Sequence, residues 1–116
     1  MNRFEAEVRA RGMTVFAHID HAAGAAAVGL SLRPTELLIF GNTKAGTRLM
    51  EATQTLGIDL PLKALVWQDT SSTAWLSYND PGFVARRHGV DGAHDAEVGA
   101  MAATLNAIAK KATTPS

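Results

Sequence analysis

The fold of this chain is decided by the stretch TELLIFGNTKAGTRLM, which spans Thr35–Met50. The consecutive apolar residues 37–40 are typical of a strand that is covered on both faces. Gly41 and Asn42 interrupt this strand, and a helix is predicted over Lys44–Leu56. Because the turn lies between a strand and a helix, it is the first place to look for a binding site.

The composition predicts a single globular domain over residues 1–116. Hydrophobic residues make up 47% of the chain and charged residues 19%, which is enough apolar material for one core. Eleven basic residues balance 11 acidic ones, so we expect no nucleic-acid binding, which rests on excess positive charge. The absence of cysteine excludes disulfides, thiolate catalysis and cysteine-based metal sites.

The N-terminus lacks the apolar core of a signal peptide, and no apolar run reaches membrane-spanning length. We therefore expect a soluble, cytoplasmic protein without a membrane partner. A formal net charge of zero also gives little electrostatic protection against self-association.

Helices and strands are predicted on both sides of the central stretch from hydrophobic spacing and from capping residues. The further helices are expected over 3–11, 21–29, 81–88 and 91–112, and the strands over 13–20, 37–40, 63–69 and 74–79. A hairpin with helices at both ends of the chain predicts an α+β fold, with a mostly antiparallel sheet of about four strands packed with helices.

Alternation within strand 13–20 places four apolar residues on one face, namely Met13, Val15, Ala17 and Ile19. In the hairpin, a register that pairs Gln68 with Ala74 would pair Trp67 with Trp75 and form a cross-strand aromatic pair. These two tryptophans are interpreted as core or dimer-interface residues.

Four segments carry a family resemblance: FAHIDHAAGA (16–25), LRPTELLIFGNTKAGTRLM (32–50), GIDLPLKALVWQD (57–69) and WLSYNDP (75–81). Together they resemble the domain-of-unknown-function 302 family, which is mostly bacterial and archaeal. The resemblance implies a small β-α-β(4)-α domain that is often dimeric and has no assigned biochemical role.

The chain departs from the family pattern in three places. The strand that usually precedes the first helix is absent, so we expect an exposed sheet edge that favours pairing with another chain. The family typically has proline at Thr43 and at Arg48, and a glycine of the hairpin turn is replaced here by Ser72.

The segment Gly41–Arg48 has the glycine spacing of a phosphate loop but lacks the Lys-Ser/Thr that must follow, so we reject nucleotide hydrolysis. Two interpretations of the turn stay open. In one, the helix N-terminus binds a small anion at Gly41–Lys44, helped by the charge of Lys44. In the other, Asn42 or Thr43 caps the helix.

His18, Asp20 and His21 form a second cluster, whose side chains are of types that bind zinc and similar metals. Their spacing along a strand is unfavourable, because His18 and Asp20 point one way and His21 the other. The alternative is that Asp20 caps the following helix.

The sequence leaves two hypotheses for the function. The first is a homodimeric module that binds a ligand or a partner without recognisable catalytic machinery. The alternative is an enzyme or small-anion-binding protein, with tentative ligand residues Asn42, Lys44, His21, Tyr78 and His88. No catalytic residue and no cofactor is predicted, and Asp80 is interpreted as a helix cap.

Overall fold

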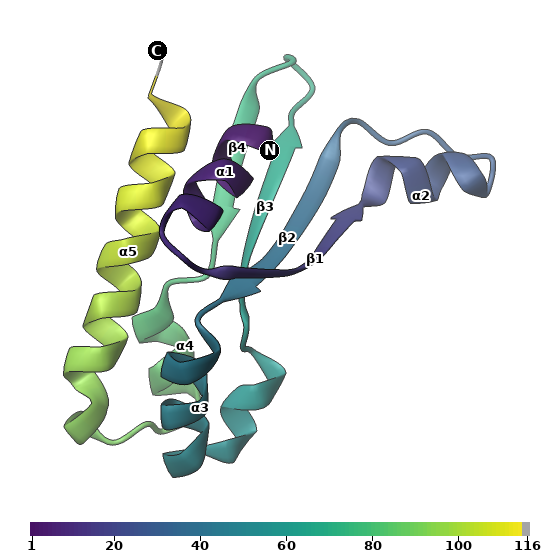
Figure 1. Cartoon of the computed structure of the whole chain (residues 1–116). Coiled ribbons are helices and arrows are strands. Elements are labelled where there is room, and N and C mark those ends of the chain that lie inside the picture. Colours follow the sequence, from purple (N-terminus) through teal and green to yellow (C-terminus); the bar gives the residue numbers. More distant parts are fainter. Residues whose placement is uncertain (115–116) are drawn as a thin grey trace.

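The computed structural model describes residues 1–114, in which helices pack against one antiparallel sheet (Figure 1). Along the chain the elements are α1 (Asn2–Ala10), β1 (Thr14–Asp20), α2 (His21–Ala27), β2 (Thr35–Gly41), α3 (Thr43–Ala52), the 3-10 helix η1 (Gln54–Ile58), β3 (Leu62–Gln68), β4 (Ala74–Tyr78), α4 (Pro81–Arg87), the 3-10 helix η2 (Gly92–His94) and α5 (Asp95–Thr113). The α+β prediction is confirmed.

The sheet has four strands in the order β1-β2-β3-β4, and each neighbouring pair is antiparallel. The predicted hairpin register is confirmed, since Trp67 pairs with Trp75 and Gln68 with Ala74. At the hairpin turn, Ser72 has a φ of 62°. The resemblance places a glycine there, and glycine is the residue that adopts this conformation without steric cost.

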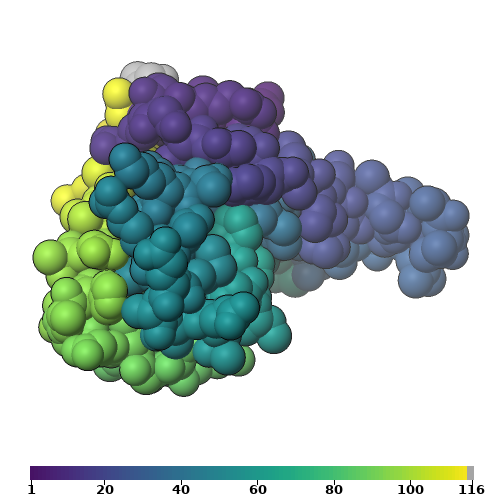
Figure 2. Space-filling model, turned by 60° about the horizontal axis from the view of Figure 1, so that its bottom comes forward, coloured from purple at the N-terminus to yellow at the C-terminus, as the bar shows by residue number. Residues whose placement is uncertain are grey.

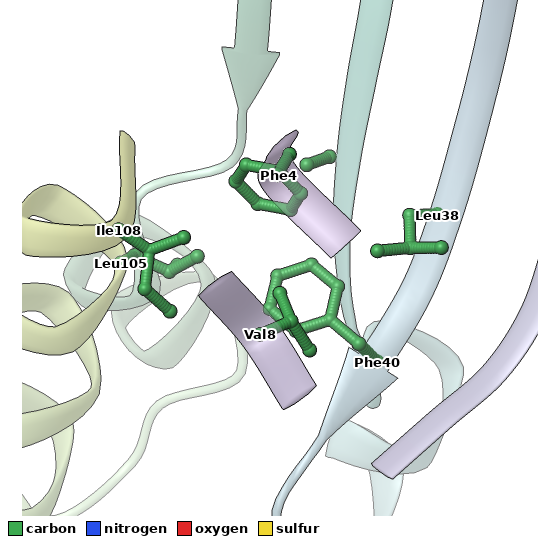
Figure 3. Packing of buried hydrophobic residues seen from close by; sticks show 7 residues of the cluster. Phe4, Val8, Leu38, Phe40, Leu105 and Ile108 are labelled. Carbon is green, nitrogen blue, oxygen red and sulfur yellow. The ribbon is translucent and has the colours of Figure 1, made fainter. Parts of the chain in front are cut away.

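Helices α1 and α5 cover one face of the sheet, with α1 crossing in front of the strands in Figure 1. The buried cluster between them and the sheet is shown in Figure 3 and consists of Phe4, Val8, Leu38, Phe40, Ala64, Leu105 and Ile108. The rings of Phe4 and Phe40 meet edge to face at 5.4 Å. The α1 and α5 residues at helical spacing therefore meet alternate residues of the strands.

Helix α1 and the last turns of α5 lie together beside this face. Nη2 of Arg3 donates to the carbonyl oxygen of Lys111 at 3.2 Å. Nζ of Lys111 forms an ion pair with Oε1 of Glu7 at 3.6 Å. A second buried cluster, which includes Leu49, Leu56 and Val98, packs α3, η1, α4 and α5 beyond the end of the sheet.

Two predicted helix ends are wrong by four residues, and one predicted helix cap makes no side-chain hydrogen bond. The helix expected over Lys44–Leu56 begins at Thr43 and ends at Ala52, because Thr53 is extended and η1 then carries Leu56 into the core. The last helix begins at Asp95 instead of Asp91, whose side chain accepts from the Ala93 N–H and caps η2. Asp80 occupies the N-cap of α4 but makes no side-chain cap bond; the following proline has already removed one N–H.

The expected single face of strand 13–20 is also wrong. The register of β1 against β2 shifts between Val15 and Ala17, which is a β-bulge at Phe16. Val15 consequently lies opposite Phe40 on the covered face, whereas Ala17 lies opposite Ile39 on the other face. One extra residue reverses every side chain that follows it.

The prediction that β2 is covered on both faces holds for one face only. The sheet residues of the buried core, Leu38, Phe40 and Ala64, all lie on the covered face. The open sheet face is formed by apolar residues that are half-buried or exposed: Ile19, Leu37, Ile39, Leu65, Trp67 and Trp75. Helices α1 and α5 both pack on the covered face, and among residues 1–114 the opposite face is left to solvent.

Candidate functional site

The turn after β2 is built by Asn42, which caps α3. Its Oδ1 accepts from the Ala45 N–H at 3.1 Å, and its carbonyl accepts from the Gly46 N–H at 2.9 Å. The capping interpretation of the turn is therefore confirmed. The side-chain oxygen of Asn42 is already used inside the helix, so it is not a free ligand for an anion.

A pocket of ≈ 160 Å³ opens beside this turn. Its walls are mainly apolar and come from the β1 bulge, α3, the segment before β3, and α5; they include Phe16, Met50, Leu60, Pro61 and Met101. Asn42, Thr43 and Thr47 supply its polar part, and Lys44 is not among its lining residues. Cavities of this size hold a molecule such as benzene, so the pocket suits a small apolar group better than a bare anion.

The structure does not bring the five tentative ligand residues together. His21 begins α2 at one end of β1, while Thr14 at the other end pairs with Gly41 next to the turn. The length of β1 therefore separates His21 from Asn42, about 20 Å at about 3.3 Å per residue. Tyr78 packs against the buried cluster on the covered face.

His88 lies in a polar cluster that the sequence did not reveal. Its Nε2 is 2.5 Å from Oδ2 of Asp59, and its Nδ1 is 3.1 Å from Oγ1 of Thr55. The hydrogen bond from His88 holds the pKa of Asp59 below its ordinary value of 3.8, and the positive charge of Arg87 acts in the same direction. No spacing rule links these residues, because they meet only through the packing of α4 on η1.

The order hydroxyl, imidazole, carboxylate in this cluster is that of a nucleophilic triad. The cavity beside Asp59 measures ≈ 20 Å³, and its lining includes neither Thr55 nor His88. That volume accommodates about one water molecule. We interpret the cluster as polar contacts that hold the C-terminus of α4 against η1.

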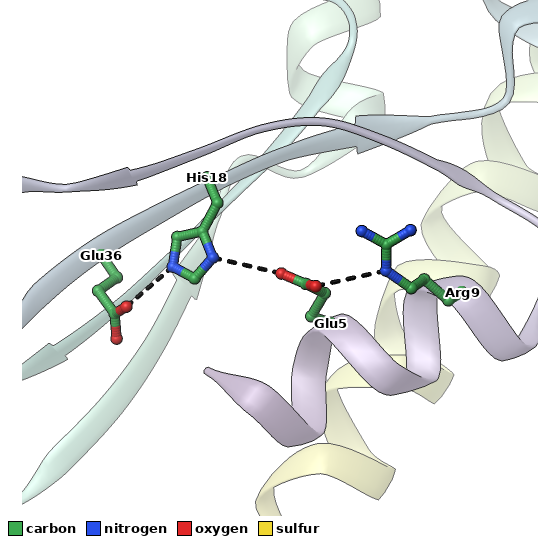
Figure 4. A network of polar contacts seen from close by, with 4 residues as sticks. All are labelled: Glu5, Arg9, His18 and Glu36. Carbon is green, nitrogen blue, oxygen red and sulfur yellow. Dashed lines mark hydrogen bonds and ion pairs between the residues drawn. The ribbon is translucent and has the colours of Figure 1, made fainter.

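His18 takes part in a chain of polar contacts rather than in a metal centre (Figure 4). Its Nε2 is 2.8 Å from Oε1 of Glu36, and its Nδ1 is 3.3 Å from Oε1 of Glu5, which also pairs with Arg9. Asp20 accepts from the Ala23 N–H at 2.9 Å and caps α2. Within residues 1–114, no group of three or more histidine and acidic side chains is arranged to hold a metal ion.

The tryptophan pair is the most distinctive feature of the open sheet face. The two rings stack with centroids 6.2 Å apart and an interplanar angle of 24°. Nε1 of Trp67 donates to Oγ of Ser77 at 2.9 Å, and Nε1 of Trp75 donates to Oδ2 of Asp69 at 2.8 Å. Their polar atoms are thus satisfied within the chain, and half of the Trp75 side chain remains exposed (50%).

Residues 21–34, here called the arm, project from the body of the molecule beyond β1 (Figures 1 and 2). The arm contains α2, which has no buried residue, and the connector to β2. Three large apolar side chains of the arm are exposed: Val28 at 71%, Leu30 at 67% and Leu32 at 50%.

Across the described part of the chain, no helix combines the length and the apolar character that crossing a membrane requires.

Comparison with known proteins gives a match to the family model described as Domain of unknown function DUF302, over residues 1–112. The chain is 44% identical over 112 residues to proteins named Fluoride-specific ion channel FluC 1 from Brucella suis and Brucella abortus. These alignments cover 97% of this chain but 44% and 42% of the two relatives. The chain thus spans less than half the length of these curated relatives.

A solved structure shares the fold. The crystal structure of an uncharacterized conserved DUF302 protein from Bacillus stearothermophilus matches with a TM-score of 0.83 over 96% of this chain and 86% of that chain. Sequence identity is 20%, so this similarity concerns the fold alone.

Proposed function

Since the chain belongs to the DUF302 family, a family described as having no known function, we propose its role from its own surface: it is a homodimeric module that binds a ligand or partner. The observation that carries this proposal is the open sheet face. Six apolar residues on neighbouring strands, including a stacked tryptophan pair, are left without a helix over them. Exposed apolar patches of a few hundred Å² mark interaction sites.

The sequence of β2 indicates that another protein surface packs on the open sheet face. The strand is apolar at consecutive positions, as in strands that are buried on both sides. On a solvated sheet face, polar residues are expected at the positions of Leu37 and Ile39, because such strands alternate between apolar and polar residues. A second copy of the chain supplies the missing layer, and the balanced formal charge of the chain opposes self-association only weakly.

Face-to-face association explains the surface better than pairing through the β1 edge of the sheet. The edge strand β1 carries the bulge at Phe16 and ends in Asp20. Bulges and charges on an edge strand are devices that prevent strand addition.

Sedimentation velocity over a micromolar concentration range tests the proposal. We expect wild type to be dimeric, and Trp75→Lys to shift towards monomer, because a charge in an apolar interface is costly to desolvate. Phe83→Lys is the matched control, since Phe83 on α4 is similarly exposed (54% against 50%) but lies off the sheet. Circular dichroism verifies that both variants fold. A monomeric wild type, or equal dissociation of both variants, would contradict the proposal.

The pocket beside Asn42 supports a second candidate function, the binding of a small ligand at the Gly41–Lys44 turn. Its apolar walls lie next to the first turn of α3, where the helix dipole favours negative charge. A small carboxylate with an apolar body matches both features. Amide chemical shifts of Gly46 and Thr47 should respond to butyrate more than to inorganic phosphate, and the absence of any response to either would refute this function.

The relatives from Brucella suis and Brucella abortus are named as fluoride-specific ion channels. We propose that fluoride conduction belongs to the part of those proteins that this chain does not match, and that the matched part is a distinct module in them. The coverage of less than half of each relative supports this division. Fluoride titration of this chain should leave its amide spectrum unchanged, and a saturable response would argue for a direct role.

A further inference from the structure

The arm raises a question of stability, because it is folded but has little to fold against. Its helix α2 spans seven residues, is capped by Asp20 and is followed by Gly29 with a φ of 79°. Isolated helices shorter than about 12–15 residues are marginal in water. Since no residue of α2 is buried in its own chain, its stability calls for a surface outside that chain.

The composition of the arm identifies the kind of surface. Residues 22–32 contain no charged side chain, although they project into solvent in Figure 2. The alanines of α2 allow close approach, and Val28, Leu30 and Leu32 provide the bulk. A segment that is exposed and also uncharged and apolar is suited to dock on another apolar surface.

A surface of that kind lies on the open sheet face of the same chain, and the arm leaves the sheet beside it. The Pro34 carbonyl, at the end of the arm, accepts from the Gln68 N–H at 3.0 Å, and Thr35 pairs with Trp67. The arm therefore starts at the end of the sheet that carries the tryptophan pair. The arm thus begins next to the open sheet face, although it points away from the sheet of its own chain (Figure 1).

We infer that in the dimer the arm of each copy lies across the open sheet face of its partner. This inference rests on the proposed dimer and specifies its geometry. In a two-fold dimer each surface patch is used twice, so one arrangement covers both arms and both faces. The neutral arm meets the partner without burying a charge, which an apolar face requires.

The available area is consistent with this arrangement. The five large exposed side chains of the two surfaces are Ile19, Val28, Leu30, Leu32 and Trp75. At about 100 Å² for each aliphatic side chain and about 100 Å² for the half-exposed indole of Trp75, they present on the order of 500 Å². A standard interface buries about 800 Å² per partner, and the half-buried residues between them contribute the remainder.

Cross-linking between two different variants tests the geometry directly, because the chain has no cysteine of its own. Leu30→Cys protein is mixed with Leu65→Cys or with Ile39→Cys protein under mild oxidation, each variant carrying a different mass tag. We expect a disulfide between the arm variant and at least one of the two face variants. Phe83→Cys, mixed with the same face variants, should give none.

The double variant Leu30→Glu with Leu32→Glu provides a second, independent measurement. We expect its dimer dissociation constant to rise at least tenfold. Its circular dichroism spectrum should lose at most the contribution of α2 and keep the signal of the sheet and of the other helices, because no residue of the arm belongs to the buried core. If wild type is dimeric but the double variant dimerises equally well and the cysteine variants give no cross-link, the arm inference is overturned and the proposed dimer stands. A wild-type monomer overturns the proposed function and the arm inference together.

Discussion

Leu37 and Leu38 are neighbours on β2, yet Leu38 is fully buried beneath α1 and α5, whereas Leu37 lies half-buried on the open sheet face. The residue type is the same and so is the strand. The two leucines differ in burial because both terminal helices, α1 and α5, pack on the side of the sheet that carries Leu38. One sheet thus has a face that stabilises the fold and a face that is available for binding.

The largest expected effect separates the two faces directly. Leu38→Ala removes a side chain from the buried cluster and should lower the free energy of unfolding by about 2–5 kcal/mol, through lost burial and the cavity left behind. Leu37→Ala should cost less than about 1.5 kcal/mol in a single chain, because Leu37 already contacts solvent.

Urea unfolding measures both values, in a Trp75→Lys background so that dimerisation does not contribute. Equal losses for the two leucines would mean that the open sheet face is as much a part of the monomer core as the covered face.

A smaller effect is expected at the rim of the covered face, where His18 connects α1 to β2 through Glu5 and Glu36. His18→Ala should destabilise the chain by about 1 kcal/mol, since it removes contacts that are partly solvated. His21→Ala is the control, because His21 begins the exposed helix α2. Thermal unfolding distinguishes the two; a matching loss in both variants would show that the His18 contacts do not hold α1.

The hairpin beside the open sheet face should become more stable with one change. Ser72→Gly relieves a left-handed backbone conformation (φ 62°) and should add about 0.5 kcal/mol to the free energy of unfolding. Ser71→Gly is the matched control at the adjacent turn position, and it should be neutral or destabilising. A destabilising Ser72→Gly would indicate that the side chain of Ser72 contributes more than its backbone strain costs.

The smallest difference should appear only in acid, at Asp69. The hydrogen bond from Trp75, followed by that from the Thr73 N–H, holds the pKa of the Asp69 carboxyl below its ordinary value of 3.8. Because the folded pKa is the lower one, this carboxylate stabilises the fold above the unfolded value, and the contribution is lost as the pH falls through the folded pKa.

Asp69→Asn should accordingly weaken the dependence of unfolding free energy on pH below about pH 5. Denaturation at a series of pH values measures this, with Asp59→Asn as a comparison because the pKa of Asp59 is lowered in the same direction. A pH dependence that is unchanged in Asp69→Asn would show that ionisation of the Asp69 carboxyl does not stabilise the fold.

Features set by a few neighbouring residues could be predicted from the sequence. The cap at Asn42, the cap at Asp20 and the pairing of Trp67 with Trp75 depend on local hydrogen bonds and on the turn that joins two strands. The bulge at Phe16 could not, since a single inserted residue leaves no mark in an alternating pattern.

The candidate site was predicted less well than the fold. The turn near Asn42 does lie beside a pocket, but Lys44 is not in its lining, and apolar residues such as Phe16 and Met101 reach it from distant segments. Likewise His88 was singled out, but its partners Asp59 and Thr55 were not. Contacts between elements depend on packing that no spacing in the sequence records.

By itself, the sequence determined the strand and helix of Thr35–Met50, the caps at their ends and the hairpin register, because these follow from hydrogen bonding and side-chain alternation over short distances. Only the tertiary structure decided that α1 and α5 cover the same face, that the bulge turns Ile19 outward, and that the arm projects. The apolar pattern of β2 calls for two covers, and the packing of a single chain supplies one.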